Sequence, residues 1–554
     1  MRRGGRGTVP TGGTRAARVA PRAVVRWAAA GVCGLALAAG SVAGQAGQRY
    51  DVLLRNGLVL DGSGNPWFRA DVAIRGGRIA AVGDLAGARA ATELDVGGLF
   101  VAPGFIDTHS HAGPGLATPG LSHARPLLAQ GITTVFINPD GGGAVDLAAQ
   151  RAELLRDGLG VNVAQMVPHG SVRGAVLGSE DRRATPEELE RMRALVRAGM
   201  EAGGWGLSSG PFYAPGSYSD THELVELAKV AAAYGGAYTS HVRDESDYTV
   251  GVVAALDEVI TVAREAGLPG VHTHIKVLGP PVWGYSAALV HRIEQARAQG
   301  VEVYADQYPY LASATGLDAA LIPRWAQAGG RDSLEVRLAR ADDRARIRVE
   351  VVDNLARRGG ADRIQFRRVR WDESWEGKLL SDVARAWGMD PVDAAMEMVS
   401  RGSASIVSFN MHERDVRTLM DQPWTMTASD GDLVPWQEGV PHPRSYGTFP
   451  RKIRTYVLEA GVVTLEDAVR SMTSLPARVF RMGDRGLLEP GKVADLVVFD
   501  LERLRDRATF TEPHQLSEGV VHVFVNGRAA VLDGAFTEVR AGEVLHRLGA
   551  RQSR

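Results

Sequence analysis

Two histidines with one residue between them stand out in residues 103–111, which read PGFIDTHSH. The apolar residues before them predict a short buried strand, and His109 and His111 follow at its carboxyl end. Side chains two positions apart on an extended chain point to the same side, so the two imidazoles can reach one ion. A bare H-x-H pair is more often structural, so the interpretation depends on what surrounds it.

Four further candidate ligands stand at the ends of later strand-like segments, in VFINPDGGG, AYTSH, VHTHIK and TMTASDG. Zinc accepts imidazole nitrogen and carboxylate oxygen, and a barrel builds its site from residues at the ends of different strands. The sequence therefore predicts a site for one or two zinc ions, or another divalent metal. Its predicted ligands are His109, His111, Asp140, His241, His274 and Asp430.

The middle of the chain alternates strand-like and helix-like segments, which indicates βα units around a parallel sheet. Thr185, Pro186 and Glu188 predict a capped helix start within it. Residues 405–409 would make a ninth strand, and we expect residues 311–422 to hold an insertion and the last crossover. The eight strand candidates are 105–108, 133–137, 161–167, 205–208, 237–240, 271–275, 301–305 and 425–428, which suit a (β/α)8 barrel.

Both ends of the chain carry short β patterns, for example DVAIRGGRIAAVG near residue 71 and VHVFVNGRAAV near residue 521. We expect one small β-domain assembled from the two ends. The predicted organisation is a signal peptide at 1–43, the small β-domain at 50–102 and 485–547, and the barrel at 103–484 with an insertion around 311–400.

The opening residues have the layout of a secretory signal peptide: arginines, an apolar stretch from 27 to 39, then Ser41-Val42-Ala43. The apolar stretch is shorter than the roughly 20 residues of a membrane span, so we expect cleavage after Ala43, no stable membrane anchor, and export to the periplasm or outside. Cys33, the only cysteine, lies in this segment. The mature protein would have no disulfide.

The charge of the chain is balanced, with 63 basic and 64 acidic residues, which argues against nucleic acid as a partner.

From Val101 onward the chain contains a series of distinctive motifs, in this order: PGFIDTHSH, ATPEELERMRAL, GLSSGPFYAPG, TSHVRDE, THIK, ADQYPY, ASDG, PHPRSYGTFPR and MTSLPAR. Through them the chain resembles the N-acyl-D-amino-acid deacylases (D-aminoacylases) of the amidohydrolase superfamily, over nearly its whole remaining length. The resemblance implies an α/β fold, a distorted TIM-like (β/α)8 barrel with a small β-sandwich domain.

The resemblance also ranks the ligands. It implies that His241, His274 and a bridging residue hold the tight zinc, whereas His109 and His111 belong to a weaker position. The family's bridge is usually a cysteine, in a motif like GVTTVVVGNCG, but this chain reads GITTVFINPDGGG and places Asp140 there. A carboxylate is a harder ligand than a thiolate, so the identity, affinity and number of metals are open.

Three residues, Lys276, Tyr308 and Arg444, match family positions that hold the amino-acid carboxylate and the reacting carbonyl. Two cations on one carboxylate are chemically reasonable. Ala314 stands where the family has a carboxylate-contacting serine, which weakens that expectation. We also expect His169, after the third strand, to face the site.

The expected reaction is hydrolysis of N-acyl-D-amino acids by a metal-activated water. Asp430 would accept the proton of that water and pass it to the departing nitrogen, as general base and then acid. A cyclic-amide or dipeptide hydrolase would share every ligand, and a non-catalytic exported binding protein is a third possibility. The partner is a small N-acyl amino acid or related amide. Side-chain preference and oligomeric state stay open.

Overall fold

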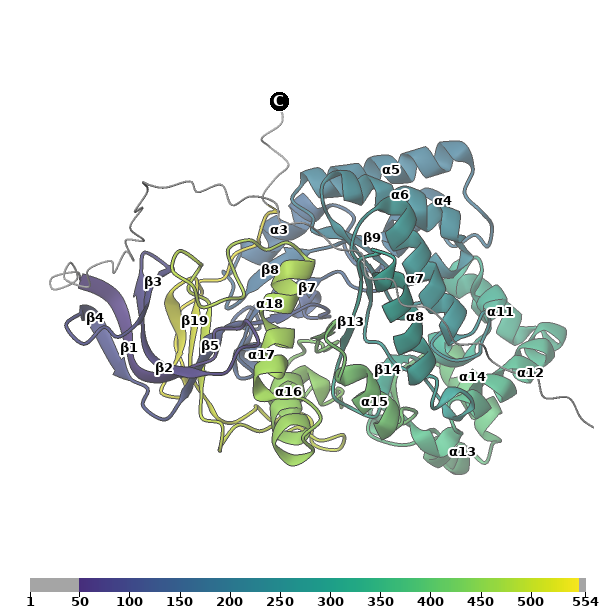
Figure 1. The fold of residues 1–554 in the computed structure, drawn as a ribbon. Coiled ribbons are helices and arrows are strands. Elements are labelled where there is room, and N and C mark those ends of the chain that lie inside the picture. The colour runs from purple at the N-terminus through teal and green to yellow at the C-terminus, as the bar shows by residue number, and fades with distance from the viewer. Residues whose placement is uncertain (1–48, 548–554) are drawn as a thin grey trace, which may run out of the picture. The chain divides into compact units, whose positions relative to one another are not determined.

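A computed structural model describes residues 49–547 of the chain (Figure 1). The predicted signal peptide at 1–43, with Cys33, lies outside the described residues. Within residues 49–547, no helix combines the length and the apolar character that crossing a membrane requires.

The centre of the fold is a parallel β-barrel, present as two hydrogen-bonded runs of strands. One run pairs β6, β7 and β8, and the other follows the order β9, β10, β11, β12, β13, β17. A single residue separates β8 from β9, so the two runs are continuous along the chain. The predicted barrel is confirmed. Its strands are β6 Phe105–Asp107, β7 Ile132–Ile137, β8 Asn162–Gln165, β9 Val167–Pro168, β10 Gly206–Ser209, β11 Ala237–Ser240, β12 Gly270–His272, β13 Val303–Gln307 and β17 Thr425–Thr427.

Helices follow the barrel strands, and the longer ones bury an apolar stripe, as Val252, Leu256, Val259 and Ala263 show on α7. Thr185 caps α5 through a reciprocal pair of hydrogen bonds with Glu188, so the predicted helix start is confirmed. These helices are α1 Gly113–Leu116, α2 Arg125–Leu128, α3 Leu147–Leu155, α4 His169–Leu177, α5 Pro186–Glu201, α6 Thr221–Ala233, α7 Val252–Ala266, α8 Ser286–Ala298, α15 Glu413–Met420, α16 Arg444–Arg451, α17 Leu465–Met472 and α18 Ser474–Val479.

A helical insertion with its own apolar core and its own small sheet lies between β13 and β17. The ninth strand candidate, 405–409, is β16 of this sheet, where antiparallel partners flank it on both sides. It therefore takes no place in the barrel. The insertion contains β14 Ser313–Gly316, α9 Leu317–Leu321, α10 Arg324–Gln327, α11 Gly330–Ala339, α12 Ala341–Arg357, β15 Ile364–Arg368, α13 Leu380–Trp387, α14 Pro391–Arg401 and β16 Ser405–Ser408.

Strands from both ends of the described chain form one nine-stranded sheet, as predicted for the small β-domain. Strand β5 pairs with β18, and this pair joins the N-terminal strands to the C-terminal ones. Figure 1 shows the purple strands beside the yellow ones. The members are β1 Arg49–Val59, β2 Phe68–Arg75, β3 Arg78–Gly83, β4 Arg89–Asp95, β5 Phe100–Pro103, β18 Leu496–Phe499, β19 Val520–Val525, β20 Arg528–Leu532 and β21 Ala535–Phe536.

A buried carboxylate connects this sheet to the barrel. Asp495, just before β18, accepts hydrogen bonds from the Asn162 side chain on β8 (3.1 Å) and from the backbone N–H of Asn526 (2.7 Å). It also forms an ion pair with Arg485, and both side chains are at most 7% exposed. The buried charge pair of Arg485 and Asp495 thus joins the sheet to Asn162 on barrel strand β8, which is far away in the sequence.

Replacing Asp495 with alanine should lower the free energy of unfolding by about 3–5 kcal/mol, because it removes the one buried carboxylate that pairs with Arg485 and leaves this buried charge only the more exposed Asp484. Thermal and urea unfolding measure the effect. Asp484→Ala is the control, since Asp484 lies 3.8 Å from the same arginine but is 36% exposed, and it should change the free energy by less than about 1 kcal/mol. Equal stabilities of the two variants would contradict the role given to Asp495.

Candidate metal centre

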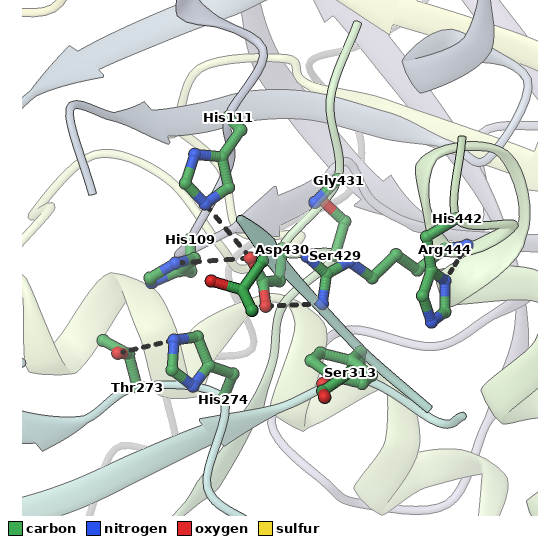
Figure 2. A network of polar contacts seen from close by, with 12 residues as sticks. His109, His111, Thr273, His274, Ser313, Ser429, Asp430, Gly431, His442 and Arg444 are labelled. Carbon is green, nitrogen blue, oxygen red and sulfur yellow. Dashed lines mark hydrogen bonds and ion pairs between the residues drawn. The ribbon is translucent and has the colours of Figure 1, made fainter. Parts of the chain in front are cut away.

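The six predicted ligands meet at the carboxyl ends of the barrel strands, although up to 321 positions separate them in the sequence, from His109 to Asp430. Within each of two groups, the candidate ligand atoms lie within 4.8 Å of one another. Figure 2 shows His109, His111 and His274 around the carboxylate of Asp430. The first group is His109, His111, Asp140 and Asp430, and the second is Asp140, His241 and His274.

Asp140 is the member that both groups share, and its Oδ1 alone faces histidines of both groups. Its Oδ2 lies 3.3 Å from Nε2 of His111, in the first group. Its Oδ1 lies 3.3 Å from Nε2 of His109 and 3.5 Å from Nε2 of His274. A carboxylate in this position can bridge two sites, which is the place the resemblance gave it.

The unpaired atoms of the cluster fit a divalent metal. Nε2 of His109 and Oδ1 of Asp140 are buried and have no hydrogen-bond partner, whereas buried polar atoms are normally paired. Nδ1 of His241 faces Nε2 of His274 at 3.0 Å, an arrangement in which two ring nitrogens compete for one proton. A cation shared by both nitrogens and the carboxylate would satisfy all of these groups.

The charge balance of the cluster supports the same interpretation. Burial lowers the pKa of His241 to about 3, so this ring is neutral and has a free lone pair. Burial acts against protonation of His274 as well, yet the surrounding carboxylates raise the pKa of His274 to about 9. The imidazoles and arginine around them hold the pKa of Asp140 and Asp430 well below the ordinary value, against burial. Two buried carboxylates therefore require positive charge beside them.

Three of the site residues, Asp140, His274 and Asp430, have positive φ values of 55°, 37° and 50°. Residues other than glycine seldom adopt this region, and such strain concentrates at functional sites. Hydrogen bonds hold two of these backbones in place: His274 N–H donates to Asp306 Oδ1 at 2.5 Å, and Asp430 N–H donates to the carbonyl of His109 at 2.8 Å.

Sequence reasoning missed two buried acids that support the cluster, Glu245 and Asp306. Glu245 Oε1 lies 2.5 Å from Nζ of Lys276 and 3.1 Å from Nδ1 of His274. Asp306 also accepts a hydrogen bond from Thr108, next to the first histidine. Glu245 lies in the motif TSHVRDE and Asp306 in ADQYPY, two of the motifs that resemble the family. Their place in these motifs is the sequence signal that could have identified them.

Three of the predicted substrate-side residues, Lys276, Tyr308 and Arg444, line one cavity of about 1060 Å³. All the predicted ligands except His109 line the same cavity. Nη1 of Arg444 lies 2.6 Å from Oδ2 of Asp430. The guanidinium carbon of Arg444 lies 4.7 Å from the ring centre of Tyr308, and Nζ of Lys276 lies 5.6 Å from it. Ala314 lines the same cavity.

His169 is not brought to the cluster, contrary to expectation. Its ring is fully buried, and Nε2 lies 2.8 Å from Oε1 of Glu223 on α6, which also pairs with Arg173. The next two residues, Gly170 and Ser171, line the cavity, but His169 does not. Its side chain is drawn to a carboxylate on the neighbouring helix, and the sequence around His169 gives no sign of this partner.

Because Asp140 is common to both groups, Asp140→Ala should weaken zinc binding in both, by at least about 100-fold, whereas His111→Ala should weaken only the first group. The zinc content of protein dialysed against buffered zinc would measure both effects. His291→Ala, at an exposed histidine of α8, is the matched control and should retain the wild-type content. Equal losses in the Asp140 and His111 variants would argue against a shared ligand.

Comparisons with known proteins agree with this geometry. The sequence model of the amidohydrolase family matches residues 92–531. The chain is 38% identical to an N-acyl-D-glutamate deacylase of Alcaligenes xylosoxydans xylosoxydans, over 90% of this chain and 97% of that protein.

Two solved structures share the fold and cover 90% of the chain and all of their own. A crystal structure of N-acyl-D-glutamate deacylase from Bordetella bronchiseptica, complexed with zinc and a phosphonate mimic of the tetrahedral intermediate, has a TM-score of 0.76 at 35% identity. A D-aminoacylase studied for its binuclear metal centre has a TM-score of 0.78 at 33% identity. The chain therefore belongs to the amidohydrolase family, and within it to the N-acyl-D-amino-acid deacylases.

Proposed function

We propose that this protein is a zinc-dependent hydrolase that removes the acyl group from N-acyl-D-amino acids and releases a carboxylate and a D-amino acid. The observation that carries the proposal is the shared carboxylate Asp140, which joins two ligand groups inside the same cavity as Lys276, Tyr308 and Arg444. The activity of similar proteins, N-acyl-D-glutamate deacylase and D-aminoacylase, supports the class of substrate.

His241, His274 and Asp140 would hold one zinc, while His109, His111 and Asp430 would complete a second position with the shared Asp140. When bound, the metal supplies an activated water and polarises the amide carbonyl. Whether one or two ions are needed depends on Asp140, because it is a carboxylate where the family usually has a cysteine.

Asp430 is the proposed general base and acid. Its Oδ1 lies 3.2 Å from Nε2 of His111 and its Oδ2 lies 2.6 Å from Arg444, so the carboxylate faces both the ligand groups and the cationic side of the cavity. The arginine and the histidines keep the pKa of Asp430 low against the effect of burial, so the group is ionised and ready to accept a proton. It would then return that proton to the departing amine.

Arg444 and Lys276 would hold the amino-acid carboxylate. A guanidinium has five donors, so Arg444 can contact both Asp430 and a substrate carboxylate. Glu245, 2.5 Å from Nζ, fixes the position of the Lys276 ammonium. Both cations lie close to the Tyr308 ring, Nζ of Lys276 at 5.6 Å and the guanidinium carbon of Arg444 at 4.7 Å from its centre. Ala314 offers no hydroxyl to the carboxylate, which places more of the recognition on these cations.

We further propose that the protein is exported, on the strength of the arginine-rich start, the apolar stretch and the small residues that end at Ala43. Its partner is then a small amide outside the cytoplasm. The balance of 63 basic and 64 acidic residues is consistent with a small-molecule partner.

Hydrolysis of a panel of N-acetyl-D-amino acids, their L forms and a hydantoin by protein of known zinc content tests the activity. We expect turnover of D substrates and loss of turnover after removal of zinc with a chelator. Turnover of the hydantoin alone would indicate a cyclic-amide hydrolase. A metal-free protein without hydrolytic activity would indicate a binding protein.

Asp430→Asn should lower kcat by roughly 10²–10⁴-fold, because the amide cannot accept the proton, while zinc held by Asp140, His241 and His274, a group without Asp430, is retained. Steady-state kinetics and metal analysis of one preparation measure both quantities. Asp421→Asn, an exposed residue before β17, is the control and should leave both unchanged. An active, zinc-loaded Asp430 variant would refute the assigned role.

A further inference from the structure

Four lysine and arginine side chains of the described residues line the cavity: Lys276, Arg358, Arg367 and Arg444. Three of them have a carboxylate partner within 2.6 Å: Lys276 with Glu245, Arg367 with Asp432 and Arg444 with Asp430. Among residues 49–547, no carboxylate lies within ion-pairing distance of Arg358, and its polar neighbours are neutral. Nη1 donates to Oγ of Ser408 at 3.0 Å, and the side chain of Tyr248 lies beside the guanidinium. Arg358 is therefore the one cation of the cavity wall without an internal counter-charge.

The surroundings of Arg358 make this absence costly. The side chain is 1% exposed, its Nε has no hydrogen-bond partner, and a guanidinium stays charged at all physiological pH values. Arginine is almost never fully buried unless it is paired. Tyr248, whose ring centre lies 5.9 Å from the guanidinium carbon, is buried beside it, and burial raises the pKa of its hydroxyl, so it stays neutral. Neither Ser408 nor Tyr248 therefore supplies a negative charge to Arg358.

The position of Arg358 indicates which part of a substrate would supply that acceptor. Its partner Ser408 is on β16 and stands opposite Ser313 of β14 in the insertion's sheet. The next residue of β14 is Ala314, the position that matches the family's carboxylate-contacting serine, and Ser313 and Ala314 both line the cavity. Arg358 therefore lies on the wall that would face the amino-acid half of the substrate.

We infer that Arg358 forms a second anion subsite, which binds the side-chain carboxylate of an acidic N-acyl-D-amino acid, glutamate or aspartate. This inference rests on the proposed deacylase function and narrows its substrate class. The α-carboxylate has Arg444 and Lys276, so a second carboxylate on the substrate provides the counter-charge that the protein does not give Arg358. The guanidinium can bind it through two parallel hydrogen bonds.

Comparing each acid with its uncharged amide isolates this charge. For the zinc-loaded wild type, we expect kcat/KM for N-acetyl-D-glutamate or N-acetyl-D-aspartate to exceed that of N-acetyl-D-glutamine or N-acetyl-D-asparagine by about 10-fold or more. Arg358→Met should remove this preference, mainly through a higher KM for the acid, while the amide's kcat/KM stays within about 3-fold.

Arg357→Met is the matched control. Arg357 neighbours Arg358 in sequence but is partly exposed and pairs with Asp247 at 3.1 Å, so its removal should leave the preference for the acid intact. Thermal unfolding and zinc content verify that each variant is folded. If Arg358→Met fails to fold, Arg358→Lys keeps the charge and should retain part of the preference, whereas Arg358→Gln should not.

Two results would overturn the inference: a wild type that hydrolyses the amides as well as the acids, or an Arg358→Met variant that keeps the preference. Either result leaves the deacylase function standing. Failure of the zinc-loaded wild type to hydrolyse any of the four N-acetyl-D-amino acids would refute the proposed function itself.

Discussion

The architecture of the site depends on one buried carboxylate, Asp140, which faces histidines of two ligand groups at once. Its Oδ1 lies 3.3 Å from His109 and 3.5 Å from His274, so the position of this one carboxylate affects both ligand groups. A second buried carboxylate, Asp430, adds negative charge on the same side. Buried anions are stable only when positive charge is close. The imidazoles and Arg444 provide part of it, and the geometry leaves room for a divalent ion to provide the rest.

Strained backbone conformations and buried acidic side chains hold these ligands in position. Asp140, His274 and Asp430 have left-handed backbones, and Asp306 receives the N–H of His274. Beneath the last barrel strand, Asp107 accepts hydrogen bonds from the backbone and hydroxyl of Ser429, the residue before Asp430. Burial raises the pKa of Asp107 to about 6, although these hydrogen bonds oppose the rise. The ligands thus depend on a layer of polar groups that never reach the cavity.

The insertion between β13 and β17 forms part of the cavity wall and adds charged side chains to it. It has its own apolar core and small sheet, so it folds around its own contacts and presents selected side chains to the barrel. Arg367 reaches Asp432 near the ligands, and Arg358 reaches the cavity without a carboxylate partner. The barrel strands supply the chemistry common to the family, while the insertion supplies the charges with which a substrate side chain would interact.

The sequence by itself determined the barrel strands, the capped helix start at Thr185, the β-domain built from both ends and the six residues that meet at the strand ends. These features follow from local rules: alternation along strands, helix capping, and the placement of polar residues after apolar runs. Only the tertiary structure decided where β16 pairs, that His169 binds Glu223 rather than the site, and that Glu245 supports Lys276. It also decided that Arg358, within residues 49–547, has the hydroxyl of Ser408 as a partner but no carboxylate. The physical reason is that the partner of a buried charge, or of a strand edge, usually lies on another element, often tens of residues away, and local periodicity contains no information about it.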